Sequence, residues 1–158
     1  MTHPPSIPRV RASAVCVALG HILVVRLEDP VSRAVFSVVP GGLVEPDESP
    51  AAAAEREVRE ETGLHVRVDP NRQRVERYPF TWSGQTFAVT THFFAARLEP
   101  RLSSEAGVNS SPTLPEPILD SGLPAYHLAT YWLALDRAEA ELGFHPAIWA
   151  ATRALISG

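Results

Sequence analysis

Three glutamates stand close together near the middle of the chain: Glu57, Glu60 and Glu61. Residues three and four apart share one face of an α-helix, so these carboxylates would point in one direction. Like charges at this spacing cost about 0.2–0.5 kcal/mol per pair, which a helix selected only for stability would avoid. A hard divalent cation reverses the sign, because carboxylate oxygens are the ligands that Mg²⁺ prefers. Three glutamates at this spacing are by themselves more typical of a solvated acidic face, and a metal site is the alternative.

The residues around these glutamates favour the metal site. Gly41 and Gly42 precede the loop that leads to the acidic segment, and a backbone without side chains can come close to a ligand or metal. Glu48 lies before the segment and Arg56 lies within it. An arginine inside an acidic face can hold one carboxylate by a bidentate pair of hydrogen bonds. These residue types together indicate a built site.

The whole segment resembles the Nudix box of the Nudix (MutT-like) hydrolase family. The resemblance covers 23 residues and meets nine specified positions: Gly42-x5-Glu48-x7-Arg56-Glu57-Val58-x-Glu60-Glu61-x-Gly63-Leu64. The preceding segment Phe36–Gly41 is similar to the strand that enters the box. The flanking strands and the segment around Trp132 resemble the family weakly.

The resemblance implies a fold, an activity and a cofactor. The fold is an α/β Nudix α/β/α sandwich with a mixed central sheet, formed by residues 1–158 as one domain. The activity is hydrolysis of a nucleoside diphosphate linked to another group X. The cofactor is Mg²⁺, with Mn²⁺ as an alternative, and the partner is a small phosphorylated, nucleotide-like substrate. A nucleotide-binding or sensor module of the same fold without turnover is the competing hypothesis, against which the intact glutamates argue.

The resemblance also implies roles for the residues of the box. The implied metal ligands are three carboxylates and one backbone carbonyl: Glu57, Glu60, Glu61 and Gly41. Glu57 would complete the metal shell or act as the general base. Arg56 and Glu48 would pair behind the ligands and orient them.

Residues outside the box give weaker signals for substrate binding. Arg26 and Arg33 flank one loop and could hold phosphates, although surface arginines are common. Tyr78, Phe80 and Trp82 lie two apart, so they share one face of a strand. Phe80 and Trp82 could stack on a base, and a packed aromatic stripe is the alternative.

The identity of the general base stays open. The family often supplies another acid shortly before a tryptophan-containing strand, but residues 123–131, which precede Trp132, contain no carboxylate. Either His127 replaces it, or the acid comes from elsewhere, or the box acts alone. The candidates in and after the preceding loop are Glu105, Glu116, Asp120 and His127. A histidine suits a general base at neutral pH because its ordinary pKa is about 6.5.

Local patterns predict the elements that must position these residues. A helix is predicted over Pro50–Thr62, because Ser49 is a good N-cap, proline suits the first turn and Gly63 suits a left-handed C-terminal residue. Apolar, β-branched runs predict seven strands: Ala12–Leu19, His21–Leu27, Val35–Val39, Leu64–Val68, Arg74–Trp82, Thr86–Leu98 and Thr130–Leu135. Asp136 with Glu139 predicts the start of a short helix, and Pro146–Ile156 predicts a closing helix. Residues 100–124 hold five prolines and predict a long loop that covers the substrate site.

Composition limits the class of function. The chain has 158 residues and a formal net charge of −4, which argues against binding a nucleic-acid polymer. It has no lysine, so Schiff-base chemistry and a phosphate-binding Walker lysine are excluded. Cys16 is the only cysteine, so no internal disulfide forms. No apolar run reaches the roughly 18 residues of a membrane span, and the N-terminus does not resemble a signal peptide. We therefore expect a cytoplasmic protein without membrane association, and a homodimer is an open alternative.

Overall fold

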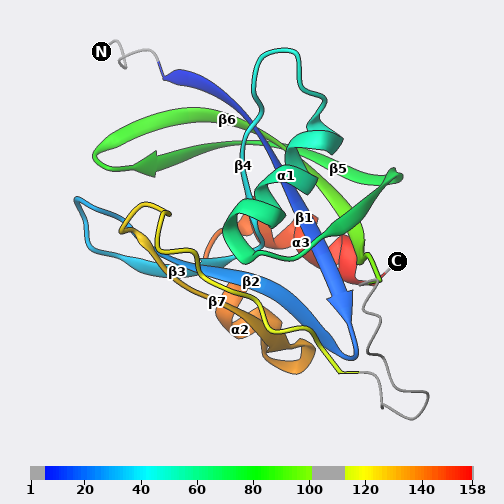
Figure 1. The fold of residues 1–158 in the computed structure, drawn as a ribbon. Coiled ribbons are helices and arrows are strands. Elements are labelled where there is room, and N and C mark those ends of the chain that lie inside the picture. The colour runs from blue at the N-terminus through cyan, green and yellow to red at the C-terminus, as the bar shows by residue number, and fades with distance from the viewer. Residues whose placement is uncertain (1–5, 101–112, 158) are drawn as a thin grey trace.

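The computed structural model describes residues 6–100 and 113–157 (Figure 1). Seven strands, three α-helices and one 3₁₀ turn follow one another in these residues. In chain order they are β1 (Ile7–Ala18), β2 (His21–Glu28), β3 (Val35–Val38), β4 (Gly41–Leu43), α1 (Pro50–Thr62), β5 (Val66–Trp82), β6 (Gln85–Leu98), β7 (His127–Ala134), η1 (Leu135–Arg137), α2 (Ala138–Leu142) and α3 (Pro146–Ile156).

The strands form one mixed sheet, which confirms the predicted fold class. The strand order is β3-β2-β1-β6-β5, with β4 paired to β1 and β7 paired to β2. β1 runs parallel to β6, and its other partners are antiparallel. The middle of β1, Arg11–Ser13, pairs with β4, and only its last residues pair with β2. The sheet therefore divides at β1 into a β5–β6 half and a β2–β3–β7 half.

Helices cover both faces of this sheet (Figure 1). Alternate residues of β1 point to opposite faces, as the pleat of a strand requires. Ala14 and Cys16 pack against Ala54 and Val58 of α1. Val15 belongs to a second buried cluster on the other face, with residues of α2 and α3. Within the residues that the structure describes, no helix is long and apolar enough to cross a membrane.

The central helix α1 begins and ends at the predicted residues. The Oγ atom of Ser49 accepts a hydrogen bond from the N–H of Ala52 at 3.1 Å, a cap that contributes about 1 kcal/mol to helix stability. Gly63 has φ of 73°, and its N–H donates to the Arg59 carbonyl at 2.9 Å. Local chemistry therefore determines both ends of the helix that carries the glutamates.

Several predicted boundaries are wrong, among them the start of β1, which begins at Ile7 and not at Ala12. Leu64–Val68 and Arg74–Trp82 are parts of one continuous strand, β5, because a bulge between Val68 and Gln73 absorbs the polar residues between them. Asp136 does not cap a helix. It lies inside the 3₁₀ turn η1, and Arg137 is the N-cap of α2 without a side-chain hydrogen bond.

The predicted long loop is described only in its second part. Residues 101–112 lie outside the described residues, and residues 113–120 form neither helix nor strand. The Pro115 carbonyl accepts a hydrogen bond from Nε1 of Trp132 at 2.8 Å. The Ile118 N–H donates to the Thr62 carbonyl at 2.8 Å. This part of the chain therefore passes the end of α1 and contacts β7.

Candidate active site

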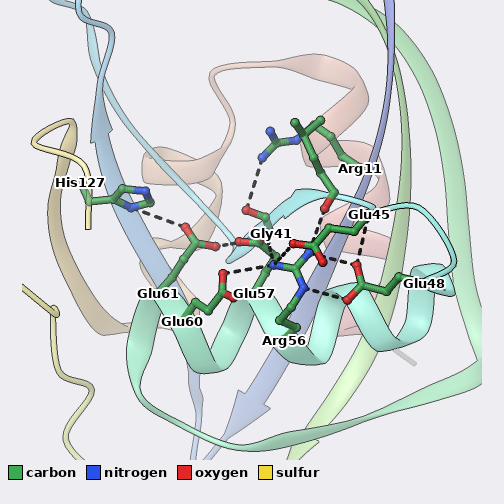
Figure 2. Close-up of polar contacts among 10 residues, drawn as sticks. Arg11, Gly41, Glu45, Glu48, Arg56, Glu57, Glu60, Glu61 and His127 are labelled. Atoms are coloured by element: carbon green, nitrogen blue, oxygen red, sulfur yellow. Dashed lines mark hydrogen bonds and ion pairs between the residues drawn. The ribbon is translucent and has the colours of Figure 1, made fainter. Parts of the chain in front are cut away.

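The three glutamates share one face of α1 but lie at different depths (Figure 2). The side chain of Glu60 is 49 % exposed, that of Glu57 15 % and that of Glu61 5 %. This gradient follows from the orientation of α1 on the sheet, because Val58 and Thr62, which directly follow Glu57 and Glu61, are buried. The three carboxylates are therefore not equivalent.

Arg56 organises the outer part of this face (Figure 2). Its Nε and Nη2 atoms donate to the two carboxylate oxygens of Glu48 at 2.7 and 3.0 Å. Its Nη1 atom donates to Glu57 at 2.9 Å and to Glu60 at 3.1 Å, and Nη2 also donates to the Leu43 carbonyl at 3.0 Å. The bidentate pair with Glu48, expected from the resemblance, is present. It lowers the pKa of Glu48 below its usual range.

Glu61 occupies a different environment at the inner end of the face. One of its oxygens accepts a hydrogen bond from the Gly41 N–H at 2.8 Å, and the other lies 3.5 Å from Nδ1 of His127. Burial, and then the charge of Glu57, raise the pKa of Glu61 to about 8. Burial also lowers the pKa of His127. Both shifts favour the neutral forms of these two side chains.

The two glycines before the loop allow the helix to approach β4. A Cβ atom on Gly42 would collide with the carboxylate of Glu57, and one on Gly41 would collide with Ser13. The Gly41 carbonyl, expected as a metal ligand, accepts a hydrogen bond from Nη2 of Arg11 at 3.4 Å. Gly42 therefore leaves room for the Glu57 carboxylate against the backbone of β4, and Gly41 leaves room for the neighbouring strand β1.

A cavity of about 310 Å³ adjoins this site. Its lining combines acidic, basic and aromatic side chains with the glycine backbone, and both halves of the sheet contribute. The residues that matter for the chemistry are Arg9, Arg11, Phe36, Gly41, Gly42, Glu57, Glu61, Phe80, Trp82, Phe87, Tyr126 and His127. The cavity thus brings two carboxylates, two arginines and a group of rings together.

The arginines in this cavity are not those expected from the sequence. Arg26 lies outside the lining and donates to the Tyr131 hydroxyl at 3.2 Å. Arg33 also lies outside it and pairs with Glu28 at 2.9 Å. Arg9 and Arg11 line the cavity instead, and the Arg9 guanidinium stacks 3.8 Å from the centre of the Phe87 ring. Their spacing of two would have indicated a shared strand face, but the expected strand began at Ala12.

The aromatic residues expected to contact substrate do line the cavity. The Phe36 ring lies edge-on to Phe80 and to Trp82, with ring centres 6.1 and 5.9 Å apart. Tyr126, which the sequence did not single out, meets Trp82 at 5.2 Å. The Tyr78 hydroxyl bonds to Thr91 at 2.7 Å and is buried. Phe80 and Trp82 thus line the cavity and also pack against Phe36.

The remaining candidates for a general base differ in whether they line the cavity. His127 lines the cavity, its side chain is 9 % exposed, and its Nδ1 atom has no hydrogen-bond partner among the described residues. Glu116 and Asp120 do not line the cavity, and Asp120 caps the N–H of Gly122 at 2.8 Å. Glu105 lies outside the described residues.

The donors at this site fit a hard divalent cation in their chemistry. Glu57 and Glu61 offer carboxylate oxygens and Gly41 a carbonyl oxygen. A cation would offset both the burial and the nearby charge of Glu57, which together raise the pKa of Glu61. In residues 6–100 and 113–157, however, no three acidic, cysteine or histidine side chains converge closely enough to hold a metal as they stand. Arg56 holds Glu57 and Glu60 in this arrangement. To bind a cation, Glu57 and Glu60 would therefore have to give up some of their hydrogen bonds to Arg56.

Comparison with known proteins places the chain in a family. The family model described as the NUDIX domain matches residues 8–148. No curated protein sequence is similar to the chain at a significant level.

Solved structures with the same fold include enzymes from several organisms. A NUDIX hydrolase from Nitrosomonas europaea superposes with a TM-score of 0.64 at 22 % identity, covering 96 % of this chain and 90 % of its own. A C. elegans Ap4A hydrolase gives 0.66 at 17 % identity, with coverages of 94 % and 96 %. The E. coli dihydroneopterin triphosphate pyrophosphohydrolase gives 0.61 at 20 % identity, with coverages of 96 % and 97 %. At these identities the similarity shows the shared fold.

Proposed function

The chain belongs to the Nudix family, and on that premise we propose that it is a divalent-metal-dependent hydrolase that cleaves a diphosphate linkage in a nucleotide-like substrate. The proposed cofactor is Mg²⁺, with Mn²⁺ as an alternative. The proposed reaction is attack of water on one phosphorus of a nucleoside diphosphate linked to another group X.

One observation carries this proposal. Two carboxylates from α1, two arginines from β1 and a group of aromatic rings line the same cavity. A diphosphate-containing substrate needs these three kinds of group together, since its phosphates are anionic, its bound cation needs oxygen ligands and its organic part is planar. A site that only stabilised the fold would gain nothing from facing buried glutamates into an open space.

Each group then has a proposed task. Glu57, Glu60 and Glu61 would hold the cation, which when bound would polarise the diphosphate and lower the pKa of the attacking water. Arg9 and Arg11 would bind the phosphate oxygens, because guanidinium groups match phosphate geometry. Phe80 and Trp82 would contact the planar part of the substrate. Arg56 and Glu48 would keep Glu57 and Glu60 oriented without touching substrate.

Two residues compete for the role of general base. Glu57 lies against Gly42 and faces the cavity, and burial raises its pKa, which makes it a better proton acceptor than an exposed glutamate. His127 has its Nδ1 atom unpartnered among the described residues and is held neutral by burial. A neutral imidazole can accept the proton of water without first losing one. We propose His127 as the base and Glu57 as a cation ligand.

A substrate panel in the presence of Mg²⁺ tests the proposed function. The panel includes nucleoside triphosphates, ADP-ribose, nucleotide sugars, a dinucleoside tetraphosphate and dihydroneopterin triphosphate, because two proteins of the same fold act on the last two. Released phosphate, diphosphate and nucleoside monophosphate are measured separately, which also identifies the bond that is cleaved. We expect turnover of at least one compound, its loss in excess EDTA and its return with Mg²⁺ or Mn²⁺. Full turnover after exhaustive removal of metal would rule the proposal out.

The alternative is a nucleotide-binding module without turnover. It is supported by the contacts of Arg56, which engage two of the expected metal ligands. The same panel separates the two hypotheses if calorimetric binding is measured beside product release. Tight binding of a nucleotide without any product would establish the alternative.

A further inference from the structure

The loop between β2 and β3 and the turn between β5 and β6 lie at the same end of the molecule (Figure 1), and Asp29 joins them. The side chain of Asp29 is buried, at 4 % exposure. Its Oδ2 atom accepts a hydrogen bond from the N–H of Ser83 at 3.0 Å. Its Oδ1 atom accepts from the N–H groups of Val31 and Ser32 at 2.8 and 3.1 Å. One carboxylate therefore orders its own loop and ties it to a turn 54 residues away.

The turn that Asp29 holds carries backbone strain. Ser83 has φ of 53° and Gly84 has φ of 79°, and together they connect Trp82 to Gln85 as a two-residue hairpin loop. Positive φ at both central positions is the type I′ pattern, which favours asparagine, aspartate or glycine at the first position. Serine there is strained because its Cβ crowds the backbone. The hydrogen bond from the Ser83 N–H to Asp29 offsets this strain.

The strained turn positions rings of the cavity. Four cavity-lining residues from three segments form what we call the aromatic wall: Phe36, Phe80, Trp82 and Tyr126. Trp82 directly precedes Ser83, and Phe36 follows the loop that Asp29 orders. The residue before Asp29 contributes too, since the Glu28 N–H donates to the Tyr126 carbonyl at 3.0 Å. The end of β2 and the residue after it are thus hydrogen-bonded to the segment that carries Tyr126 and to the turn that follows Trp82.

We propose that Asp29 is a positioning residue for substrate recognition, which by holding the Ser83 turn against the β2–β3 loop sets the spacing of the aromatic wall around a planar ring of the substrate. This inference rests on the proposed function, because it takes the cavity as the substrate site. Asp29 itself does not line the cavity. Its effect therefore reaches the substrate through Trp82 and Phe36, and it concerns binding of the ring and not the chemistry at phosphorus.

Asp29→Asn is the sharpest test, because it is isosteric and breaks one contact selectively. The amide oxygen can keep the two hydrogen bonds to Val31 and Ser32, which leaves the amide NH₂ facing the N–H of Ser83, donor against donor. Ser32→Ala is the matched control: it removes the 3.2 Å hydrogen bond from the Ala34 N–H in the same loop and leaves the bond to Ser83 intact.

The expected result is a change in KM alone. For the best substrate of the panel, KM rises about tenfold in Asp29→Asn, the scale of one lost hydrogen bond to a charged acceptor, while kcat stays unchanged. Inorganic tripolyphosphate, a ring-free competitive inhibitor, keeps its wild-type inhibition constant. Amide hydrogen exchange at Ser83 accelerates in the variant. Ser32→Ala behaves as wild type in all three measurements.

Two other kinetic outcomes would overturn the inference. A wild-type KM together with faster exchange at Ser83 would show that the contact exists but does not position the wall. Equal losses for the nucleotide and for tripolyphosphate would show a general disturbance of the site. If the wild-type enzyme hydrolyses nothing, the proposed function fails, and the inference is judged on calorimetric ATP affinity: weaker binding by Asp29→Asn supports it and equal binding overturns it. Should this variant not fold, the same measurements are made with Ser83→Gly added, because glycine removes the strain at φ 53° without restoring the bond to Asp29.

Discussion

The acidic face of α1 divides into two regions that balance charge in opposite ways. In the Arg56 region, the carboxylates of Glu48, Glu57 and Glu60 each accept a hydrogen bond from one guanidinium within 3.1 Å. In the Glu61 region, the carboxylate accepts one backbone N–H, from Gly41, and faces an imidazole that burial keeps neutral. Glu57 of the first region and Glu61 of the second are one helical turn apart and are the same residue type.

This difference separates stability from function. Charges that are paired and hydrogen-bonded inside the protein strengthen the fold only while both partners are present. A buried carboxylate without a cationic partner destabilises the folded state until something positive binds it. The Arg56 region thus holds the site together. The Glu61 region holds a carboxyl group whose pKa is raised to about 8, and a bound cation would take the place of its proton. Four predictions test this division, and they are ordered by the size of the expected effect.

The largest effect is expected on the chemical step when Glu61 loses its charge. Glu61→Gln should lower kcat about thousandfold, equivalent to roughly 4 kcal/mol of barrier, without unfolding the protein. Glu60→Gln should lower kcat by a smaller factor, because its side chain is 49 % exposed and Arg56 already engages it. Steady-state kinetics at saturating Mg²⁺ measure both. Near-wild-type kcat in both variants would show that neither glutamate serves the cation.

The second effect is on stability, when Arg56 is removed. Arg56→Ala leaves three carboxylates without their shared donor, and we expect a loss of about 3 kcal/mol in the free energy of unfolding, together with loss of activity. Arg59→Ala, an exposed position on the same helix, is the control and should change stability little. Urea denaturation measures both. An unchanged free energy of unfolding with lost activity would place Arg56 in contact with substrate.

The third effect is a pH-dependent difference in melting temperature. The pKa of Glu61 is raised to about 8 in the folded protein, so protonation stabilises the fold and this contribution is lost as pH rises through that value. Glutamine imitates the protonated form at every pH. Without metal, Glu61→Gln and the wild type should melt together near pH 4, and the variant should melt about 5 °C higher near pH 9.

Addition of Mg²⁺ sharpens this third test. The cation should stabilise the wild type at alkaline pH more than it stabilises Glu61→Gln, because the variant lacks one of the three carboxylates proposed to hold it. Differential scanning calorimetry measures all four conditions. A melting difference that does not depend on pH would show that Glu61 carries no uncompensated charge.

The smallest effect concerns His127, at the edge of the Glu61 region. Burial lowers its pKa, so the neutral base persists to pH values below the ordinary 6.5, and kcat should fall only as pH drops through that lowered pKa. His127→Gln should remove this acid limb and lower the plateau of kcat about tenfold. This is less than the roughly hundredfold or more that is typical of a general base, because glutamates can partly replace it. A pH–rate profile of the two proteins decides it. An acid limb that survives in the variant would assign the base to Glu57.

Much of the site follows from the sequence because its chemistry is local. The N-cap Ser49, the proline after it and Gly63 determine where α1 begins and ends, and helical spacing alone puts the glutamates on one face. The bidentate contact between Arg56 and Glu48 spans eight residues and was expected from the resemblance of this segment to the Nudix box. The predictions were wrong where a 3₁₀ turn precedes a helix, at Asp136, and where a bulge carries a strand through polar residues, in the centre of β5.

What only the tertiary structure decided depends on strand register and on packing between distant segments. Register of β1 against β4 and β6 turns Arg9 and Arg11 toward the cavity, while Arg26 and Arg33 lie outside it. Packing of α1 on the sheet makes Glu61 buried and Glu60 exposed, although the two are neighbours in sequence.

By itself, the sequence determined the helix, its caps, its acidic face and the class of ion that such a face attracts, because those depend on interactions within a few residues. It did not determine which arginines face the carboxylates, how deep each carboxylate lies, or that Asp29 meets Ser83 across 54 residues. Those features arise when the two halves of the sheet come together at β1, because side-chain burial is a property of the packed layers and not of any one segment.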